Sequence, residues 1–253
     1  MKPDGPGVEA PPRATHTVAV VGGAVGGIKT TAAINLAVAL AMPGRRVWVC
    51  DLDPTAAATR ALGCTPHDTS AGGGAHEVRL SRRVRGQVAV MAGLDRVGGA
   101  TAAADATGAA GPPEVAVVDC APIGEEGATR AFRRARLVLV PVDASPAALS
   151  VIDAVAGALG GPGGSSVVGR ESPHAGPRLR LALGRVLPRS VDRWAVVERL
   201  AESYPGALYA TTIPMGRRSG AGGARPATLY APTTRAAAAY AALAREVWAD
   251  LDS

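Results

Sequence analysis

Aromatic residues, cysteine pairs and long apolar runs are all scarce in this 253-residue sequence. Phe, Tyr and Trp make up 3% of the chain and hydrophobic residues 47%, so a core must be built from Ala, Val and Leu. No apolar run approaches the roughly 18 residues that a membrane span needs. The three cysteines form no C-x-x-C pair and indicate no disulfide framework. They predict free buried thiols, with an iron–sulfur cluster shared across a dimer as the alternative.

Lysine is nearly absent, although the net charge is +6. Lys2 and Lys29 are the only lysines, and every other basic residue is arginine. Lys2 lies in residues 1–14, a segment rich in Pro and Gly without the apolar stretch of a signal peptide, which we expect to be a disordered tail of a cytoplasmic protein. Lys29 lies in a glycine-rich segment before a helix. A single compact ammonium at that place indicates a chemical requirement, since arginine serves everywhere else.

Short apolar runs alternate with helical stretches from residue 15 onward. Strands are expected at residues 16–21, 46–50, 87–91, 115–118, 137–140, 179–187 and 208–213. Helices are expected at residues 30–41, 56–62, 146–159, 191–203 and 235–251. This order predicts a single α/β domain over 15–253, with a doubly wound, mostly parallel sheet covered by helices on both faces. Residues 63–86 and 160–177 are predicted to be flexible loops, and 97–110 a weak helix or loop.

An apolar strand, a glycine loop, Lys-Thr-Thr and a helix follow one another in the order of a P-loop. In such a loop the backbone N–H groups and the helix N-terminus surround phosphate oxygens. Lys29 would reach the β and γ phosphates of ATP, and the Thr30 hydroxyl would bind Mg²⁺. An ordinary glycine-rich turn is the alternative. The residues predicted to bind nucleotide here are Gly23, Gly26, Gly27, Lys29, Thr30 and Thr31.

One position departs from the G-x-x-x-x-G-K-[ST] pattern. Aligning Gly23 with the first glycine puts Ile28 where the second glycine belongs. If that position requires a positive φ, a β-branched residue there is strained by about 1–3 kcal/mol. The Ile28 side chain would also crowd the β phosphate. Gly26 and Gly27 taking over the turn in a shifted loop is the alternative.

Three carboxylates follow predicted strands. Asp51 and Asp53 come after the second strand, and Asp119 comes after a wholly apolar one. In an open parallel sheet these strand ends line the ligand crevice. Asp119 is predicted to hold Mg²⁺ through water, Asp53 to orient the attacking water, and Asp51 to support the metal. For each residue a helix cap or a surface turn is the alternative.

These motifs together resemble the ParA family of deviant-Walker P-loop ATPases, within the ParA/MinD type and closest to Soj-like partitioning ATPases. The similarity extends from about residue 17 to residue 247. It is carried by the segments K-T-T-A-A-I-N-L-A at 29–37, D-L-D-P-T-A-A-A-T at 51–59, V-V-D-C-A-P at 117–122, L-V-L-V-P-V at 137–142 and T-I-P at 212–214.

The resemblance implies an ATP-dependent switch with ATP and Mg²⁺ as cofactors. ATP would promote a homodimer that binds DNA nonspecifically, and a ParB-like partner would stimulate hydrolysis. By matching position, Lys29 and Asp53 take catalytic roles, and Thr30 and Asp119 take metal-binding roles. Pro214 and Met215 fall where the family contacts adenine, largely through the backbone.

Two departures from the family leave two functions open. Ala24 stands where the family has its signature lysine, and Ile28 stands in place of a glycine. The first function is a slow ATPase acting in plasmid or chromosome partitioning or in cargo positioning. The second is a nucleotide-binding scaffold that does not hydrolyse ATP and acts through protein partners. A third, a membrane-positioning protein of the MinD kind, is disfavoured because the last helix ends in Asp250 and Asp252 rather than in basic residues.

Arginines supply the candidate DNA contacts. Arg189 and Arg193 are four residues apart and would share one helical face. Arg217 and Arg218 lie just beyond the T-I-P segment, where the resemblance places basic DNA-contacting residues. Cations that face phosphates give binding without base readout, so the affinity should fall steeply with added salt. Solvated surface charge is the alternative.

Overall fold

The computed structural model describes most of the chain between His16 and Ser253. The described residues are 16–23, 28–65, 76–78, 80, 84–92, 113–124, 126–143, 145, 147–160, 176–186, 192–214 and 233–253. The predicted tail at 1–14 and the predicted helix or loop at 97–110 lie outside them, as do large parts of 63–86 and 160–177.

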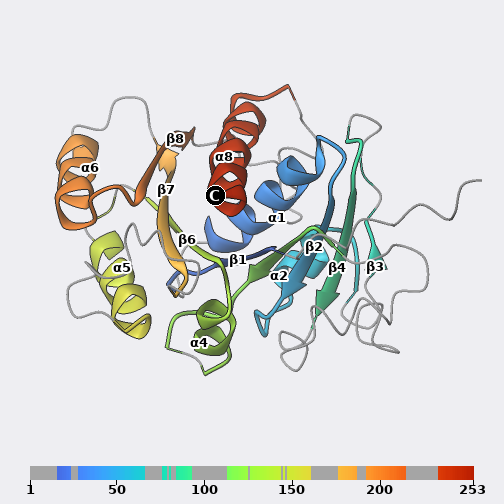
Figure 1. Cartoon of the computed structure of the whole chain (residues 1–253), viewed down its shortest axis with the longest axis horizontal. Helices are drawn as coiled ribbons and strands as arrows, with labels where there is room; N and C mark the ends of the chain where they lie inside the picture. The colour runs from blue at the N-terminus through green and yellow to red at the C-terminus, as the bar shows by residue number, and fades with distance from the viewer. Residues whose placement is uncertain are drawn as a thin grey trace, which may run out of the picture.

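One sheet of eight strands runs through the molecule (Figure 1). Its order is β3-β4-β2-β5-β1-β6-β7-β8, and each neighbouring pair is parallel except β3 with β4. The strands are β1 (His16–Val20), β2 (Arg46–Asp51), β3 (His76–Glu77), β4 (Gln87–Ala92), β5 (Val115–Asp119), β6 (Leu137–Val142), β7 (Arg178–Val186) and β8 (Leu208–Pro214). The predicted doubly wound, mostly parallel sheet is confirmed.

Helices cover both faces of this sheet (Figure 1). In one hydrophobic cluster the strands meet side chains of α1, α2 and α8, and in a second cluster they meet side chains of α4, α5 and α6. The helices are α1 (Ile28–Ala41), α2 (Ala57–Ala61), α4 (Glu126–Arg133), α5 (Ala147–Ala158), α6 (Asp192–Ser203) and α8 (Arg235–Asp252). The short helix α4 and the strand β3 have no counterpart in the elements predicted from sequence.

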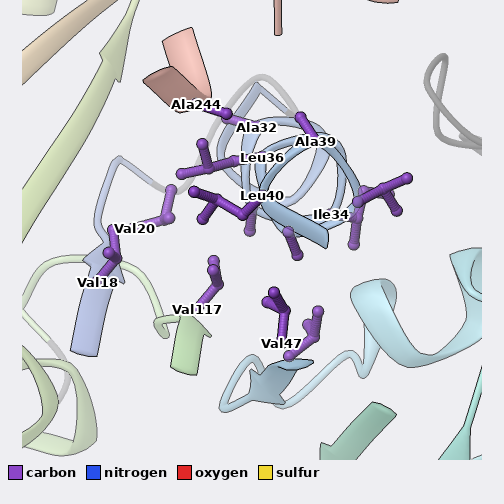
Figure 2. Close-up of a cluster of buried hydrophobic side chains, with 14 of the residues drawn as sticks. Val18, Val20, Ala32, Ile34, Leu36, Ala39, Leu40, Val47, Val117 and Ala244 are labelled. Carbon is purple, nitrogen blue, oxygen red and sulfur yellow. The ribbon is translucent and has the colours of Figure 1, made fainter. Parts of the chain in front are cut away.

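Helix α1 lies at the centre of the first cluster. It is apolar nearly all round, as expected for a helix that packs on the sheet below and against α8. Figure 2 shows Leu36 and Leu40 on the same helix as Ala32, which lies near Ala244 of α8. Leu36 and Leu40 are fully buried, and each stabilises the fold by about 1.5–3 kcal/mol through the apolar surface that it removes from water.

Helix α8 is tied to the last two strands by charged side chains. The Asp250 carboxylate accepts hydrogen bonds from Arg180 Nε at 2.6 Å, from Arg180 Nη2 at 3.0 Å and from the Tyr209 hydroxyl at 2.7 Å. Such a bidentate arginine–carboxylate contact fixes the orientation of both side chains and pairs their opposite charges. The apolar stripe of this helix packs on the core, because Tyr240, Leu243, Val247 and Leu251 are buried and Trp248 packs against them.

Strand β8 forms one edge of the sheet and receives a second anchor from α8. The Glu246 carboxylate accepts hydrogen bonds from Ala210 N at 2.9 Å and Thr211 N at 3.0 Å. These two residues lie where the register between β7 and β8 shifts, between the pairs Leu181–Leu208 and Leu183–Thr212. The Glu246 side chain therefore accepts hydrogen bonds from backbone N–H groups in the stretch where the strand pairing is irregular.

None of the helices within the described ranges has the length and apolar character needed to cross a bilayer.

Candidate nucleotide and magnesium site

The register of three central strands brings the candidate carboxylates to one level of the sheet. Asp119 of β5 pairs with Val20 of β1 on one side and with Asp51 of β2 on the other. Side chains alternate between faces along a strand. Because Val117 and Val49 face the cluster of α1, α2 and α8, Asp119 and Asp51 face it as well. Both carboxylates therefore point toward the helices that follow β1 and β2.

Lys29 lies in the first turn of α1 and reaches the acidic side chains at this level. Its ammonium nitrogen is 2.8 Å from Asp119 Oδ1 and 3.1 Å from Asp53 Oδ2, and it also donates to the carbonyl oxygen of Cys120. Lys29 is 6% exposed. Burial alone would lower the pKa of Lys29, but the two carboxylates outweigh burial and raise it. The ammonium is thus held charged in the interior.

Asp119 is completely buried, and one of its oxygens has no partner. Burial raises the pKa of Asp119 to about 6, although Lys29 and the neighbouring Thr30 hydroxyl pull it down. Among the described residues, Asp119 Oδ2 is the buried side-chain oxygen that accepts no hydrogen bond. A buried carboxylate oxygen without a donor costs free energy, and a bound cation or its water would satisfy it.

Asp53 is held by its own turn as well as by Lys29. Its Oδ1 accepts hydrogen bonds from the Thr55 backbone N–H at 2.9 Å and from the Thr55 hydroxyl at 2.6 Å. Burial would raise the pKa of Asp53, but the Thr55 hydrogen bonds and Lys29 together lower it. Asp53 is therefore ionised at neutral pH and has a fixed orientation. The spacing Asp53-Pro54-Thr55 is typical of such a turn, so the sequence contains a signal for Thr55 that the pattern of strand ends alone does not give.

Asp51 is turned away from Lys29 and toward α2. Its Oδ2 accepts hydrogen bonds from Thr59 N and Thr59 Oγ1, both at 2.8 Å, and its Oδ1 accepts one from Asp53 N at 3.2 Å. Thr59 N is one of the donors that a helix N-terminus leaves unpaired. The residue at the usual capping position, Ala56, has no side-chain acceptor and a left-handed backbone with φ of 49°. Asp51 therefore caps α2 from the neighbouring strand, which is the alternative considered for it above.

These residues fit a magnesium–nucleotide site in which the nucleotide supplies part of the coordination. Within the described ranges, no three His, Cys, Asp or Glu side chains gather as a metal site. Mg²⁺ typically uses one or two carboxylates together with phosphate oxygens and waters, rather than a cage of protein side chains. The unpartnered Asp119 oxygen and the nearby Thr30 hydroxyl are oxygen ligands that suit Mg²⁺ in this way.

Ile28 begins α1 without the strain considered for it. Among the described residues other than glycine, Ala56 is the one with a positive φ, so Ile28 is not left-handed. Its side chain lies against Gly184 of β7. The stem of Lys29 instead runs past Gly22, where an added Cβ would lie 3.5 Å from Lys29 Cβ. In this conformation the two adjacent side chains diverge.

The remaining predicted residues are placed only in part. Thr31 continues α1, and Gly23 lies close to Val151 of α5. Pro214 ends β8 at the sheet edge remote from β2. The backbone of Arg193 lies in α6. Gly26, Gly27, Met215, Arg189, Arg217 and Arg218 lie outside the described residues. Sequence reasoning had no signal for the Cys120 carbonyl, because any residue supplies one.

Comparison with known proteins found a match to a family model and several solved structures with a similar fold. A model described as an AAA domain matches residues 15–84, which span β1 through β3 and include Lys29, Asp51 and Asp53. No curated protein sequence matches the chain.

Three solved structures illustrate the similarity in fold. MinD cell division protein from Aquifex aeolicus is 20% identical, with a TM-score of 0.64 over 92% of this chain and 97% of that one. Cobyrinic acid a,c-diamide synthase from Mycobacterium smegmatis, with a bound ATP analogue and magnesium, is 23% identical, with a TM-score of 0.65 over 93% and 94%. A plasmid partition protein from Borrelia burgdorferi bound to AMPPNP is 13% identical, with a TM-score of 0.63 over 93% and 98%. The chain therefore has the fold of the ParA/MinD-type P-loop ATPases.

Proposed function

We propose that this chain binds ATP with Mg²⁺ and acts as a slow ATPase switch in partitioning or cargo positioning. One observation carries the proposal: a buried lysine at the start of the helix after β1 meets two carboxylates from the ends of β2 and β5. Phosphate, metal and lysine meet at this place in a P-loop site. Two of the similar structures are a MinD cell division protein and a plasmid partition protein, which supports the choice of process.

Each residue would have a defined task in that function. Lys29 would exchange its contacts with Asp53 and Asp119 for contacts with the β and γ phosphates. Thr30 and Asp119 would hold Mg²⁺, which when bound would neutralise charge on the phosphate oxygens. Asp53, once released by Lys29, would orient the attacking water. Asp51 has a structural task in α2, so its predicted metal role is not part of the proposal.

DNA binding and dimer formation extend the proposal to partners. Arg189, Arg193, Arg217 and Arg218 would contact phosphates of nonspecific DNA, ATP would promote the homodimer, and a ParB-like protein would stimulate hydrolysis. The net charge of +6 favours a polyanionic partner. Binding of a labelled random duplex should weaken steeply between low and moderate salt, whereas binding that is insensitive to salt would contradict this part.

A scaffold that binds ATP without hydrolysing it is the second candidate. The contacts of Asp53 in this conformation favour the scaffold. Both carboxylate oxygens already accept hydrogen bonds, one from Thr55 and the other from Lys29. A general base must reach the proton that it takes. Ala24, in place of the signature lysine of the ParA resemblance, removes a charge that would otherwise stabilise the phosphates.

Binding and turnover of ATP by the purified protein, with and without DNA, test both candidates. ATP hydrolysis that is lost in Asp53→Ala and retained in Asp252→Ala, an exposed carboxylate at the end of α8, would support the switch. Tight Mg²⁺-dependent ATP binding without turnover, even with DNA present, would support the scaffold. If the protein binds no ATP at millimolar concentration, both are wrong.

A further inference from the structure

Ile28 occupies the position directly before Lys29, where the phosphate-loop pattern has a glycine. Its backbone belongs to α1 and has no positive φ. The position therefore demands no glycine for conformational reasons here. The branched side chain of Ile28 still needs room. For ATP to bind, this side chain must lie away from the place that the phosphates would occupy.

That side chain is accommodated by Gly184. A Cβ added to Gly184 would lie 2.8 Å from Ile28 Cδ1 and 3.6 Å from Ile28 Cγ1. The first distance is shorter than real Cβ contacts, so any side chain at position 184 would force the Ile28 Cδ1 methyl to move, and a branched one would meet more of the Ile28 side chain. Gly184 is buried, and its φ lies outside the left-handed range. Space, and not backbone freedom, is therefore what glycine supplies at this place.

The alternation of β7 explains why the space opens toward α1. Leu179, Leu181 and Leu183 pack on the face of α4, α5 and α6. The intervening residues face the other way, where Arg180 binds Asp250 of α8 and Ala182 joins the first cluster. Side-chain size on this face thus falls from Arg180 through Ala182 to Gly184, two residues before the strand ends at Val186. Ile28 fills the room that this decrease leaves.

Helix geometry connects this contact with the site. Successive residues on an α-helix are rotated by about 100°, so Ile28 and Lys29 leave the helix in different directions. With Ile28 directed at β7, Lys29 is directed at Asp119 and Asp53. An obstacle at position 184 would move the first turn of α1, and Lys29 with it, because both residues belong to that turn.

We propose that Gly184 is a positioning residue for the first turn of α1: it receives the Ile28 side chain and so keeps that side chain away from the place beside Lys29 that a nucleoside triphosphate would take. The proposal rests on the ATP binding proposed above. It adds a specific pairing, in which an isoleucine directly before Lys29 is tolerated because Gly184 of β7 has no side chain to meet it.

Moving the branched side chain from position 28 to position 184 tests the pairing of Ile28 with Gly184. Gly184→Val should lower the affinity for a fluorescent ATP analogue by about tenfold, because overpacking displaces the first turn of α1. Alanine is a weaker test, since it meets only the flexible end of Ile28. Ile28→Ala in the Gly184→Val protein moves the branched side chain from helix to strand at similar volume, and should restore the affinity to within about threefold of wild type.

A matched control separates positioning from general stability. Ile152→Val removes one methylene from the other core cluster, and it should lower the melting temperature without changing ATP affinity. The inference is overturned if Gly184→Val binds ATP as tightly as wild type, or if Ile28→Ala restores its melting temperature but not its affinity. Failure of the wild-type protein itself to bind ATP would identify the proposed function, together with this inference, as wrong.

Discussion

The Asp51 carboxylate and Thr59, eight residues apart, are joined by two hydrogen bonds of 2.8 Å each. The first comes from the backbone N–H in the first turn of α2 and the second from the hydroxyl. Burial raises the pKa of Asp51, and the Thr59 hydrogen bonds oppose that rise. This pair joins the end of β2 to the helix that follows it, and it gives the aspartate a role other than metal binding.

Asp51→Asn should therefore damage the fold more than the site. Loss of the charged cap should lower the free energy of unfolding by about 1–2 kcal/mol, as for other helix caps. The dependence of ATP binding on Mg²⁺ concentration should stay as in wild type. In Asp119→Asn, by contrast, the Mg²⁺ requirement should rise severalfold. Urea unfolding and a Mg²⁺ titration of ATP binding measure the two effects, and a raised Mg²⁺ requirement in Asp51→Asn would restore its metal role.

Removal of the Lys29 charge should strongly destabilise the nucleotide-free protein. Lys29→Met leaves Asp119 and Asp53 without their shared cation, and breaking such a buried pair costs about 3–5 kcal/mol. The same substitution at Lys2, in the predicted tail, provides a matched control that should leave the unfolding free energy unchanged. Combining Lys29→Met with Asp119→Asn should recover part of the loss, because the uncompensated charge is then gone.

An additive loss in that double variant would mean that the two side chains do not interact energetically.

The loss in Lys29→Met should depend on pH. Asp119 has a pKa of about 6 in the folded protein against an ordinary value of 3.8, so the folded state binds more protons than the unfolded state between these values. Stability from this group is present at low pH and is lost as pH rises through 6. Without Lys29 the folded pKa rises further, so the destabilisation relative to wild type should be smaller at pH 5 than at pH 8, by up to about 1.4 kcal/mol per pH unit.

Comparing the variant with wild type at each pH removes the contribution of other titrating groups such as His16, whose pKa burial lowers in both proteins. A destabilisation that is equal at pH 5 and pH 8 would be inconsistent with the buried carboxylate.

Ala56 is the place where a glycine should improve the fold. Its φ of 49° is left-handed, a conformation that costs a residue with a Cβ about 1–2 kcal/mol. Ala56→Gly should raise the free energy of unfolding by about 0.5–1 kcal/mol, after the extra chain entropy of glycine is subtracted. The same substitution at the next residue, Ala57, which begins α2, should be destabilising instead. Thermal unfolding of the pair decides this, and equal effects would refute it.

The strands and most helices could be predicted because buried elements contain regular patterns of apolar residues. β6 is apolar throughout and β5 is apolar up to its last residue, Asp119, since helices cover both faces of these strands, and such runs predict buried strands directly. Helix α4 was missed because it has only eight residues and many polar ones. Strand β3 has two exposed residues, so its pairing with β4 rather than its composition defines it.

The candidate site divides in the same way. Lys29 and Asp119 could be predicted, because a lone lysine after a glycine loop and an aspartate after an apolar strand are local patterns. Their contact is consistent with those predictions. The Asp51–Thr59 cap and the accommodation of Ile28 by Gly184 could not be predicted, because each depends on how a helix lies over a strand. Sequence spacing fixes which face a residue occupies, but not the neighbour that it meets there.

The Glu246 contact with β8 bears on how two copies of this protein can associate. An exposed edge strand invites a second chain to continue the sheet, and this is a route to filaments and aggregates. Here a carboxylate occupies two adjacent amides of that strand, and the shifted register makes the strand irregular. An incoming strand would have to displace a negative charge and straighten the irregularity. Self-assembly by sheet extension is disfavoured at β8, so a homodimer would have to form through another surface.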